Sequence, residues 1–323
     1  MGRFLKAFRT VFISIAIISA VELSILATTG SKGDDFRLFG LEYLKEISRE
    51  KLLLVNKLRY FRDKNSEMVS VGDSSGLVSL KPQVIEKHLN GMKFYNGNVM
   101  QPAGIAGYRH IAEIFLQNNS NIKYLIYHIS PHQRKIGEEI RIGWSPLIYS
   151  NYLSYYHFIF ALPSTKYRAG VVNFAYYPNK NSVKLSDSFT KLSEHDGFVN
   201  LPFGGKKEVG ECDFTGWLDK DGESILGEEL TEVKKVAEKY KVKLVVIFGA
   251  TSCISGEKIK PLLADLEKFQ KNNPDVFVPI GLINHRDLSD FGDAFHINAS
   301  GADSYSEMIG EVLKEMDLSA AVE

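Results

Sequence analysis

Short apolar segments alternate with segments of helical periodicity from Met68 to the end of the chain. The apolar segments, each long enough for one strand, are residues 68–72, 92–99, 122–129, 243–250 and 276–282. The helical segments are residues 82–89, 105–117 and 260–271. Nearly continuous apolar strands that alternate with helices are typical of a parallel sheet covered on both faces. The pattern therefore predicts an α/β fold, a three-layer α/β/α arrangement with a mainly parallel, doubly wound sheet.

The last helix is the clearest element of the pattern. Its apolar residues recur at i, i+3, i+4, i+7, i+8 and i+11, and they are Tyr305, Met308, Ile309, Val312, Leu313 and Met316. This spacing places them on one side of a helix. We therefore expect a terminal helix that covers the sheet.

The alternation of strands and helices is interrupted between about residues 134 and 240. Eleven of the 34 residues from Trp144 to Tyr177 are Trp, Tyr or Phe, and residues 201–222 carry turn signals without a helical period. This predicts an aromatic-rich insertion in an α/β domain that spans residues 66–323. The aromatic side chains either form a small core of the insertion or stack on sugar rings or a partner. We interpret residues 218–229 as a turn before a solvated helix.

The N-terminus has a different pattern, since residues 11–28 form one long apolar stretch after a segment with three Lys or Arg residues. About 20 apolar residues cross a bilayer, and basic residues favour its cytoplasmic side. We therefore predict a cytoplasmic tail at residues 1–10, a transmembrane anchor at 11–29 and a connecting helical segment at 30–65. The domain after them is expected to be extracytoplasmic, in the periplasm or at the cell surface.

Two features of the apolar stretch leave alternatives open. Glu22 lies within it, and a carboxylate there costs about 2 to 3 kcal/mol unless it faces a partner or an aqueous cavity. The small residues Ala27 and Thr29 also fit a signal peptide that is cleaved before Gly30. The apolar length favours the uncleaved anchor.

Composition and charge exclude several classes of protein. The chain is 44% hydrophobic and 24% charged, which is typical of a globular protein. Lys and Arg number 39, as do Asp and Glu, so no net positive field indicates nucleic acid, and we predict no nucleic-acid partner. Cys212 and Cys253 lack the spacing of a zinc site, and we predict neither a metal nor another cofactor. They are either buried thiols or, if the domain is exported, one disulfide.

The segment MVSVGDSS, residues 68–75, places Ser74 at the end of the first strand of the domain. In open parallel sheets, sites form outside the carboxyl ends of the strands. A nucleophilic serine needs a base, and the base needs an acid that orients it. Asp293 and His296 stand three residues apart before the last helix. We therefore predict that the Asp293 carboxylate holds Nδ1 of His296 while Nε2 faces Ser74.

The GDSS segment and the DxxH segment before the last helix resemble the motifs of the SGNH (GDSL-type) hydrolase superfamily. This resemblance implies that Ser74 is the nucleophile, His296 the base and Asp293 its partner. It also implies that the backbone N–H groups of Ser74 and Gly104 bind the oxyanion. The third motif of the family, G-x-N-D, is absent, and residues 130–132 read Ser-Pro-His at its position. A third oxyanion donor is therefore not assigned.

The resemblance covers about residues 66–133 and 240–318. With its predicted anchor and its missing third motif, the chain is most similar to membrane-anchored proteins of bacterial polysaccharide O-acetylation. This implies transfer of an acyl group from a donor to a cell-envelope glycan, in partnership with a multi-spanning membrane acyltransferase. The alternatives are an esterase of the same fold and an inactive scaffold that binds glycan or a membrane acyltransferase.

Each residue of the candidate site also has an alternative interpretation. Ser75 competes with Ser74 as the nucleophile. Asp293 is alternatively a loop carboxylate, and His296 caps the helix that follows. Gly104 alternatively permits a tight turn.

Overall fold

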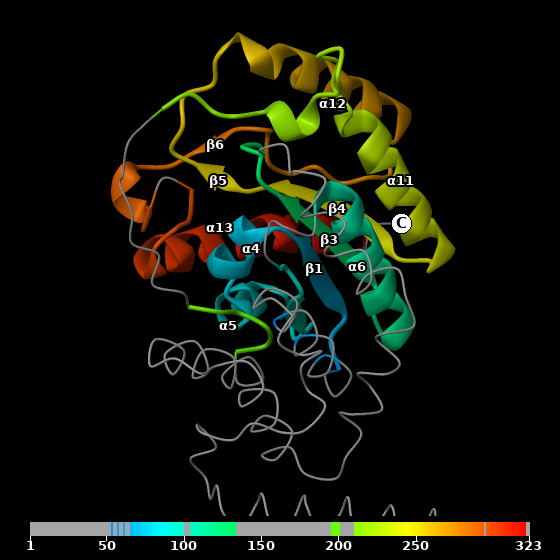
Figure 1. Ribbon diagram of the computed structural model, residues 1–323. Helices are drawn as coiled ribbons and strands as arrows, with labels where there is room; N and C mark the ends of the chain where they lie inside the picture. Colours follow the sequence, from blue (N-terminus) through cyan, green and yellow to red (C-terminus); the bar gives the residue numbers. More distant parts are fainter. Residues whose placement is uncertain are drawn as a thin grey trace, which may run out of the picture.

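The computed structural model describes Leu53, Lys57, Phe61 and residues 65–99, 104–133, 195–200, 210–293 and 295–320. This part of the chain forms a four-stranded parallel sheet packed with helices (Figure 1). The α/β class with a mainly parallel sheet, predicted from the sequence, is confirmed.

The four strands are β1 (Met68–Gly72), β2 (Phe94–Asn96), β3 (Tyr124–Ile129) and β4 (Lys243–Phe248). Their order in the sheet is β2-β1-β3-β4, so β1 lies between β2 and β3. In register, Gly72 pairs with His128 and Ile129 pairs with Phe248. The carboxyl ends of β1, β3 and β4 therefore lie at one edge of the sheet.

The predicted strand at residues 276–282 is wrong as a full strand. Only Phe277 pairs with the sheet, through a parallel bridge to Val245. Pro279 lacks an amide donor and Gly281 adds backbone freedom, and both disfavour a continuous ladder. Separate from the main sheet, β5 (Ala250–Thr251) and β6 (Asn284–His285) form a short parallel pair.

Alternate residues of the strands enter two different hydrophobic cores. In β4, Leu244 and Val246 belong to one core, whereas Val245 and Ile247 belong to the other. Both faces of the sheet are therefore buried, which explains why the strands read as nearly continuous apolar runs.

In the described ranges, six α-helices and four 3-10 helices surround the sheet. The α-helices are α4 (Ser74–Ser79), α5 (Pro82–Ile85), α6 (Gly104–Asn118), α11 (Leu226–Lys239), α12 (Lys260–Asn272) and α13 (Ala299–Ala320). The 3-10 helices are η1 (Glu86–His88), η5 (Thr215–Trp217), η6 (Glu257–Ile259) and η7 (Leu288–Asp290). Apolar residues of α6, α11 and α12 share one core, and those of α5 and α13 share the other (Figure 1). The expected terminal helix that covers the sheet is thus present as α13.

Helix α11 corrects the interpretation of residues 134–240 as an insertion that ends in a solvated helix. Leu226, Leu230, Val233 and Ala237 recur at i, i+4, i+7 and i+11, and all four are buried in the same core as α6 and α12. The other side of the helix carries charged residues that dominate its composition, so composition alone does not reveal the apolar stripe. Helix α11 is therefore part of the α/β core.

Three predicted parts of the chain lie outside the described residues, namely the tail at residues 1–10, the anchor at 11–29 and the aromatic-rich segment at 144–177. Within the described ranges, no helix is both long and apolar enough to cross a membrane. Of the predicted connecting segment, Leu53, Lys57 and Phe61 are helical and buried. This part of the segment therefore packs against the domain.

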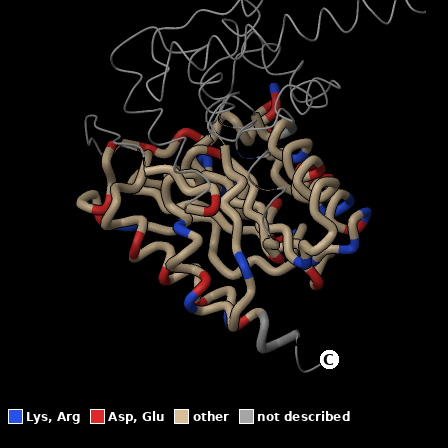
Figure 2. Tube along the Cα trace, turned by 90° about the horizontal axis from the view of Figure 1, so that it is seen from below, with Lys and Arg blue, Asp and Glu red and all other residues tan. Residues whose placement is uncertain are grey.

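Acidic and basic residues are interspersed along the described part of the chain. In the view of Figure 2, Lys and Arg alternate with Asp and Glu over the helices, without a continuous region of one sign. Several of these residues form exposed ion pairs, such as Lys123 with Glu67 and Lys235 with Glu232. Exposed pairs of this kind contribute little to stability.

Candidate active site

The loop after β1 brings Ser74 to the carboxyl edge of the sheet. Gly72 is required there, because a Cβ atom at this position would lie 1.4 Å from the carbonyl oxygen of His128 on β3. Asp73 is the N-cap of α4, and its carboxylate accepts a hydrogen bond from the backbone N–H of Ser75 at 3.0 Å. The strand thus ends at Gly72, which permits close packing against β3. Asp73 then caps the helix whose first residue is Ser74.

Ser74, His296 and Asp293 form one chain of hydrogen bonds. The Oγ atom of Ser74 lies 2.9 Å from Nε2 of His296. On the other side of the ring, Nδ1 lies 2.9 Å from Oδ2 and 3.1 Å from Oδ1 of Asp293. A carboxylate can only accept, so Nδ1 carries the proton and the lone pair of Nε2 faces the serine hydroxyl. The structure therefore brings together the three residues selected from the sequence.

The Asp293 carboxylate also organises the loop that carries the histidine. Its Oδ1 atom accepts the backbone N–H groups of Phe295 at 2.8 Å and His296 at 2.7 Å. Partial burial would raise the pKa of Asp293, but the hydrogen bonds from the His296 ring and from these N–H groups outweigh it and hold the pKa below its ordinary value. Asp293 is therefore ionised at neutral pH and keeps the ring of His296 in one orientation.

Ser75 is engaged elsewhere, which distinguishes it from Ser74. Its hydroxyl donates to Oδ1 of Asp73. It also lies against β4, since a Cβ at Gly249 would be 2.8 Å from the Oγ of Ser75. Of the two candidate serines, only Ser74 therefore has a hydrogen bond to His296 among the described contacts.

Asp73 is a buried carboxyl group that links two strand ends. It is 3% exposed, and Oδ2 accepts the backbone N–H of Ser130, after β3, at 3.3 Å. Burial raises the pKa of Asp73, and the hydrogen bonds from Ser75 and Ser130 oppose this rise. Asp73 was not predicted as a site residue, although aspartate is one of the residues that favour the N-cap position of a helix.

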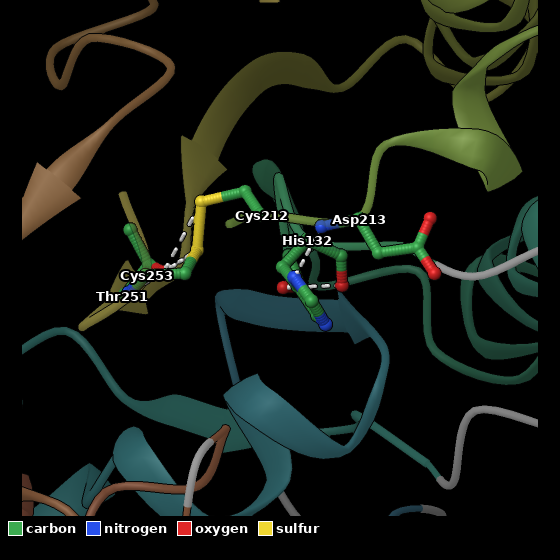
Figure 3. Close-up of a disulfide and its surroundings, with 6 residues drawn as sticks. His132, Cys212, Asp213, Thr251 and Cys253 are labelled. Atoms are coloured by element: carbon green, nitrogen blue, oxygen red, sulfur yellow. Dashed lines mark hydrogen bonds between the residues drawn. A yellow bond between two sulfur atoms is a disulfide. The ribbon is translucent and has the colours of Figure 1, made fainter. Parts of the chain in front are cut away.

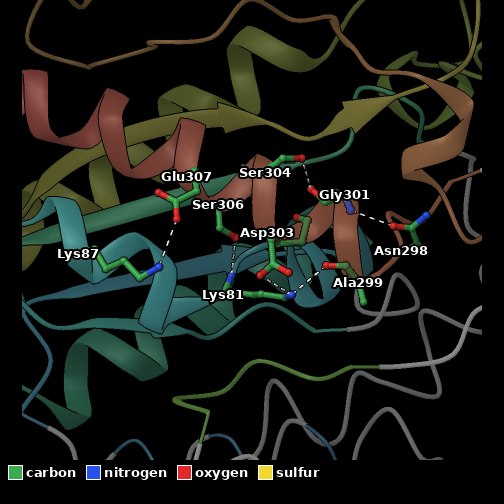
Figure 4. Close-up of polar contacts among 10 residues, drawn as sticks. Lys81, Lys87, Asn298, Ala299, Gly301, Asp303, Ser304, Ser306 and Glu307 are labelled. Carbon is green, nitrogen blue, oxygen red and sulfur yellow. Dashed lines mark hydrogen bonds and ion pairs between the residues drawn. The ribbon is translucent and has the colours of Figure 1, made fainter.

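Contacts between α13 and the turn after α4 hold the serine against the histidine (Figure 4). The hydroxyl of Ser306 donates to the backbone oxygen of Ser79 at 2.8 Å and accepts the backbone N–H of Lys81 at 2.9 Å. The Nζ atom of Lys81 donates to the backbone oxygen of Ala299 at 2.9 Å and to Asp303 at 2.6 Å. Since Ser74 begins α4 and His296 precedes α13, these bonds fix the two elements relative to each other.

Gly104, the second predicted oxyanion donor, is the first residue of α6 and has a φ of 70°. This conformation favours glycine and agrees with the alternative interpretation, a tight turn. No hydrogen bond between Gly104 and the three site residues occurs in the described ranges, and residues 100–103 lie outside them. Its role at an oxyanion stays a prediction.

His132, where the third family motif was expected, lies beside the site. Its Nδ1 atom accepts the backbone N–H of Asp213 at 2.7 Å. Its ring stacks on that of Phe295, with centroids 4.5 Å apart and planes inclined by 20°. Phe295, between the predicted acid and base, is 38% exposed. This pairing was not predictable from the sequence, because the two rings come from distant loops.

Cys212 and Cys253 form a disulfide next to His132 (Figure 3). The sequence left a bridge and two thiols as alternatives, and the structure has the bridge. In the described ranges, His132 and the two cysteines are the one group of His, Cys, Asp and Glu side chains close enough to hold a metal ion. Both sulfur atoms are already bonded to each other, so this group has no thiolate to offer.

His128 is a buried histidine outside the hydrogen-bonded chain of the site. It is 0% exposed, and burial lowers its pKa to about 3. Its Nε2 lies 3.2 Å from the hydroxyl of Tyr305, which itself donates to the backbone oxygen of Phe248 at 3.2 Å. His128 is therefore neutral and donates from Nε2.

No model of a known protein family matches the chain, and no curated protein sequence has significant similarity to it.

Proposed function

We propose that the chain is a serine-dependent acyl-transfer enzyme related to the SGNH (GDSL-type) hydrolases, with a three-layer, doubly wound α/β/α domain. The observation that carries the proposal is the hydrogen-bonded chain from Ser74 through His296 to Asp293. Activation of a serine nucleophile needs three groups in this order. They are the hydroxyl, an imidazole whose lone pair faces that hydroxyl, and an ionised carboxylate on the other side of the ring.

The reaction has two halves. His296 takes the proton of Ser74 through Nε2 as Oγ attacks the acyl carbonyl, and Asp293 stabilises the imidazolium that forms. The imidazolium returns the proton to the leaving group, and the acyl group remains on Ser74. An acceptor hydroxyl then gives its proton to His296 and attacks the acyl-enzyme. As the bond between the acyl carbon and Oγ breaks, His296 returns this proton to Oγ, which releases the ester product and restores the hydroxyl of Ser74.

Negative charge on the carbonyl oxygen needs hydrogen-bond donors. The backbone N–H groups of Ser74 and Gly104 are the donors that the resemblance implies. Loss of one such donor costs about 3 kcal/mol of transition-state stabilisation in known cases. The resemblance assigns no third donor.

The proposed acceptor is a hydroxyl of a cell-envelope glycan, and the proposed location is extracytoplasmic, with residues 11–29 as the membrane anchor. The disulfide between Cys212 and Cys253 supports export, because disulfides persist mainly in oxidising compartments. A multi-spanning membrane acyltransferase is the proposed source of the acyl group. An esterase, in which water takes the place of the sugar, is the runner-up because the same site serves both reactions.

A fluorophosphonate probe, which reacts with activated serines, tests the proposal. The full-length wild-type chain should be labelled at Ser74, and Ser75→Ala should be labelled equally. Ser74→Ala and His296→Ala should lose the label while they keep the melting temperature of the wild type. A folded wild-type protein without label would contradict the proposal and favour an inactive scaffold. Release of acetate with and without a glycan acceptor then distinguishes the transferase from the esterase.

A further inference from the structure

Lys57 is a fully buried lysine that the proposed mechanism does not use. Its Nζ atom donates to the backbone oxygen of Asn96 at 2.7 Å and approaches Oδ1 of the same residue at 3.4 Å. Within the described ranges it has no ion pair with a carboxylate. Burial lowers the pKa of Lys57 well below its ordinary value. A buried amine needs hydrogen-bond partners, and among the described residues Asn96 is the one that supplies them, so this contact offsets the cost of burying Lys57.

Asn96, the last residue of β2, holds the helix that begins at Ser74. Its Nδ2 atom donates to the backbone oxygens of Gly76 at 3.0 Å, Leu77 at 3.2 Å and Leu80 at 2.7 Å. Two hydrogens thus serve three carbonyl groups at the end of α4, of which that of Gly76 also accepts the backbone N–H of Leu80 at 3.1 Å. The last carbonyl groups of a helix lack an internal partner, and the amide of Asn96 supplies one. Asn96 therefore fixes the position of α4.

The hydrogen bonds around Asn96 allow its amide one orientation. Its Oδ1 atom accepts the backbone N–H of Asn98 at 3.1 Å and Nδ2 of Asn98 at 3.0 Å. Donors, including Lys57, therefore surround the oxygen, and carbonyl groups surround the nitrogen. A flipped amide would lose both sets of bonds.

Lys57 itself is held by the part of the chain that precedes the domain. Leu53, Lys57 and Phe61 recur at i, i+4 and i+8, and the ring of Phe61 packs against Tyr95 and Phe115 with centroids 4.9 and 4.8 Å apart. The hydroxyl of Tyr95 donates to the backbone oxygen of Lys57 at 2.8 Å. Ring packing and a hydrogen bond thus fix Phe61 and Lys57 beside β2.

We propose that Lys57 is a positioning residue whose amine holds the nucleophile helix α4 in place through Asn96. The inference rests on the proposed function, since the position of α4 affects a reaction only if Ser74 reacts. Without the amine, the backbone oxygen of Asn96 loses its donor, and the amide that holds α4 is less restrained. Misplacement of a reacting group by about 1 Å can lower a rate by about 100-fold.

Lys57→Met tests this inference, because methionine fills similar volume without a donor. In the full-length chain, we expect the rate of fluorophosphonate labelling at Ser74 and the kcat for nitrophenyl acetate to fall about tenfold, with KM little changed. The matched control is Phe61→Leu, which weakens the packing of the same segment but keeps Lys57. Phe61→Leu should lower the melting temperature as much as Lys57→Met or more, yet it should change the labelling rate by less than about twofold.

Equal labelling rates in Lys57→Met and Phe61→Leu would overturn the inference and leave Lys57 a structural residue. Should Lys57→Met not fold, Tyr95→Phe takes its place, since it removes the hydroxyl that donates to the backbone oxygen of Lys57. Its labelling should then be slower by about two- to threefold, and an unchanged rate would overturn the inference. A wild-type chain that is not labelled at all would instead contradict the proposed function.

Discussion

The Oγ atom of Ser74 lies 2.9 Å from Nε2 of His296, although 222 residues separate them in the sequence. Two features of the fold produce this contact. The parallel sheet places the end of β1 at its carboxyl edge, and Ser306 and Lys81 tie the turn after α4 to α13. The serine and the histidine are therefore positioned by the core and not by their own loops alone.

The first prediction concerns Asp293→Asn. The amide has nearly the same size and still accepts the backbone N–H groups of Phe295 and His296, so the melting temperature should stay within a few degrees. It also favours the wrong tautomer of His296 and removes the charge that stabilises the imidazolium. We expect acyl turnover to fall by about 10⁴-fold, as for the equivalent change in a serine protease. Measurement of turnover and melting temperature on one preparation checks both statements.

Near-normal turnover in Asp293→Asn would remove this residue from the catalytic assignment. It would then be the loop carboxylate of the alternative interpretation, with Ser74 and His296 left as a pair.

The second prediction concerns the helix that carries Ser74. A Cβ at Gly76 would lie 2.6 Å from Nδ1 of His128 and 2.7 Å from the side chain of Asn98, both of which are buried. Gly76→Ala should therefore lower the free energy of unfolding by about 1 to 3 kcal/mol or more. The control is Gly281→Ala, because no atom lies within 4 Å of a Cβ at that position. Urea denaturation of both variants should show a clear loss only for Gly76→Ala, and equal stability would mean that α4 has room to shift.

The third prediction is a pH dependence of stability that arises from Glu229 on α11. Burial raises its pKa from 4.5 to about 7, although Nη1 of Arg109 at 3.2 Å opposes this rise. The folded state therefore binds this proton more tightly than the unfolded state. The resulting stabilisation is fully present below pH 4.5 and is lost as the pH rises to about 7.

Glu229→Gln cannot ionise, so it should lack this part of the pH dependence. The quantity to compare is the free energy of unfolding of Glu229→Gln minus that of the wild type. Between pH 4.5 and pH 7.5 this difference should increase by on the order of 3 kcal/mol, since each unit of pKa shift corresponds to about 1.4 kcal/mol. Denaturation curves of both proteins across this range measure the difference. A constant difference would mean that Glu229 is ionised throughout, paired with Arg109.

Much of the fold could be predicted from the sequence, because its signals are local. The strands β1, β3 and β4 are short, nearly continuous apolar runs, and the apolar stripe of α13 has a clear helical period. The prediction missed the core position of α11, where charged residues dominate the composition. It also extended the strand around Phe277 through Pro279 and Gly281, where a single parallel bridge is all that forms.

The candidate site was predictable only where its residues lie within short motifs. Ser74, Asp293 and His296 belong to segments of this kind. The role of Asn96 was not readable, because its side chain bonds residues 16 to 20 positions earlier in the sequence and the buried Lys57, which is 39 positions earlier. The stacking of His132 on Phe295 likewise depends on how distant loops meet.

Trapping the acyl-enzyme shows most directly whether Ser74 carries the acyl group. The full-length chain would be mixed with nitrophenyl acetate, quenched in acid during turnover and digested, and its peptides would be analysed by mass spectrometry. We expect one acetyl group on Ser74 of the wild type, and neither this acetyl group nor turnover in Ser74→Ala. Acetylation of Ser75 in place of Ser74, or undiminished turnover in Ser74→Ala, would contradict the role of Ser74 as the nucleophile.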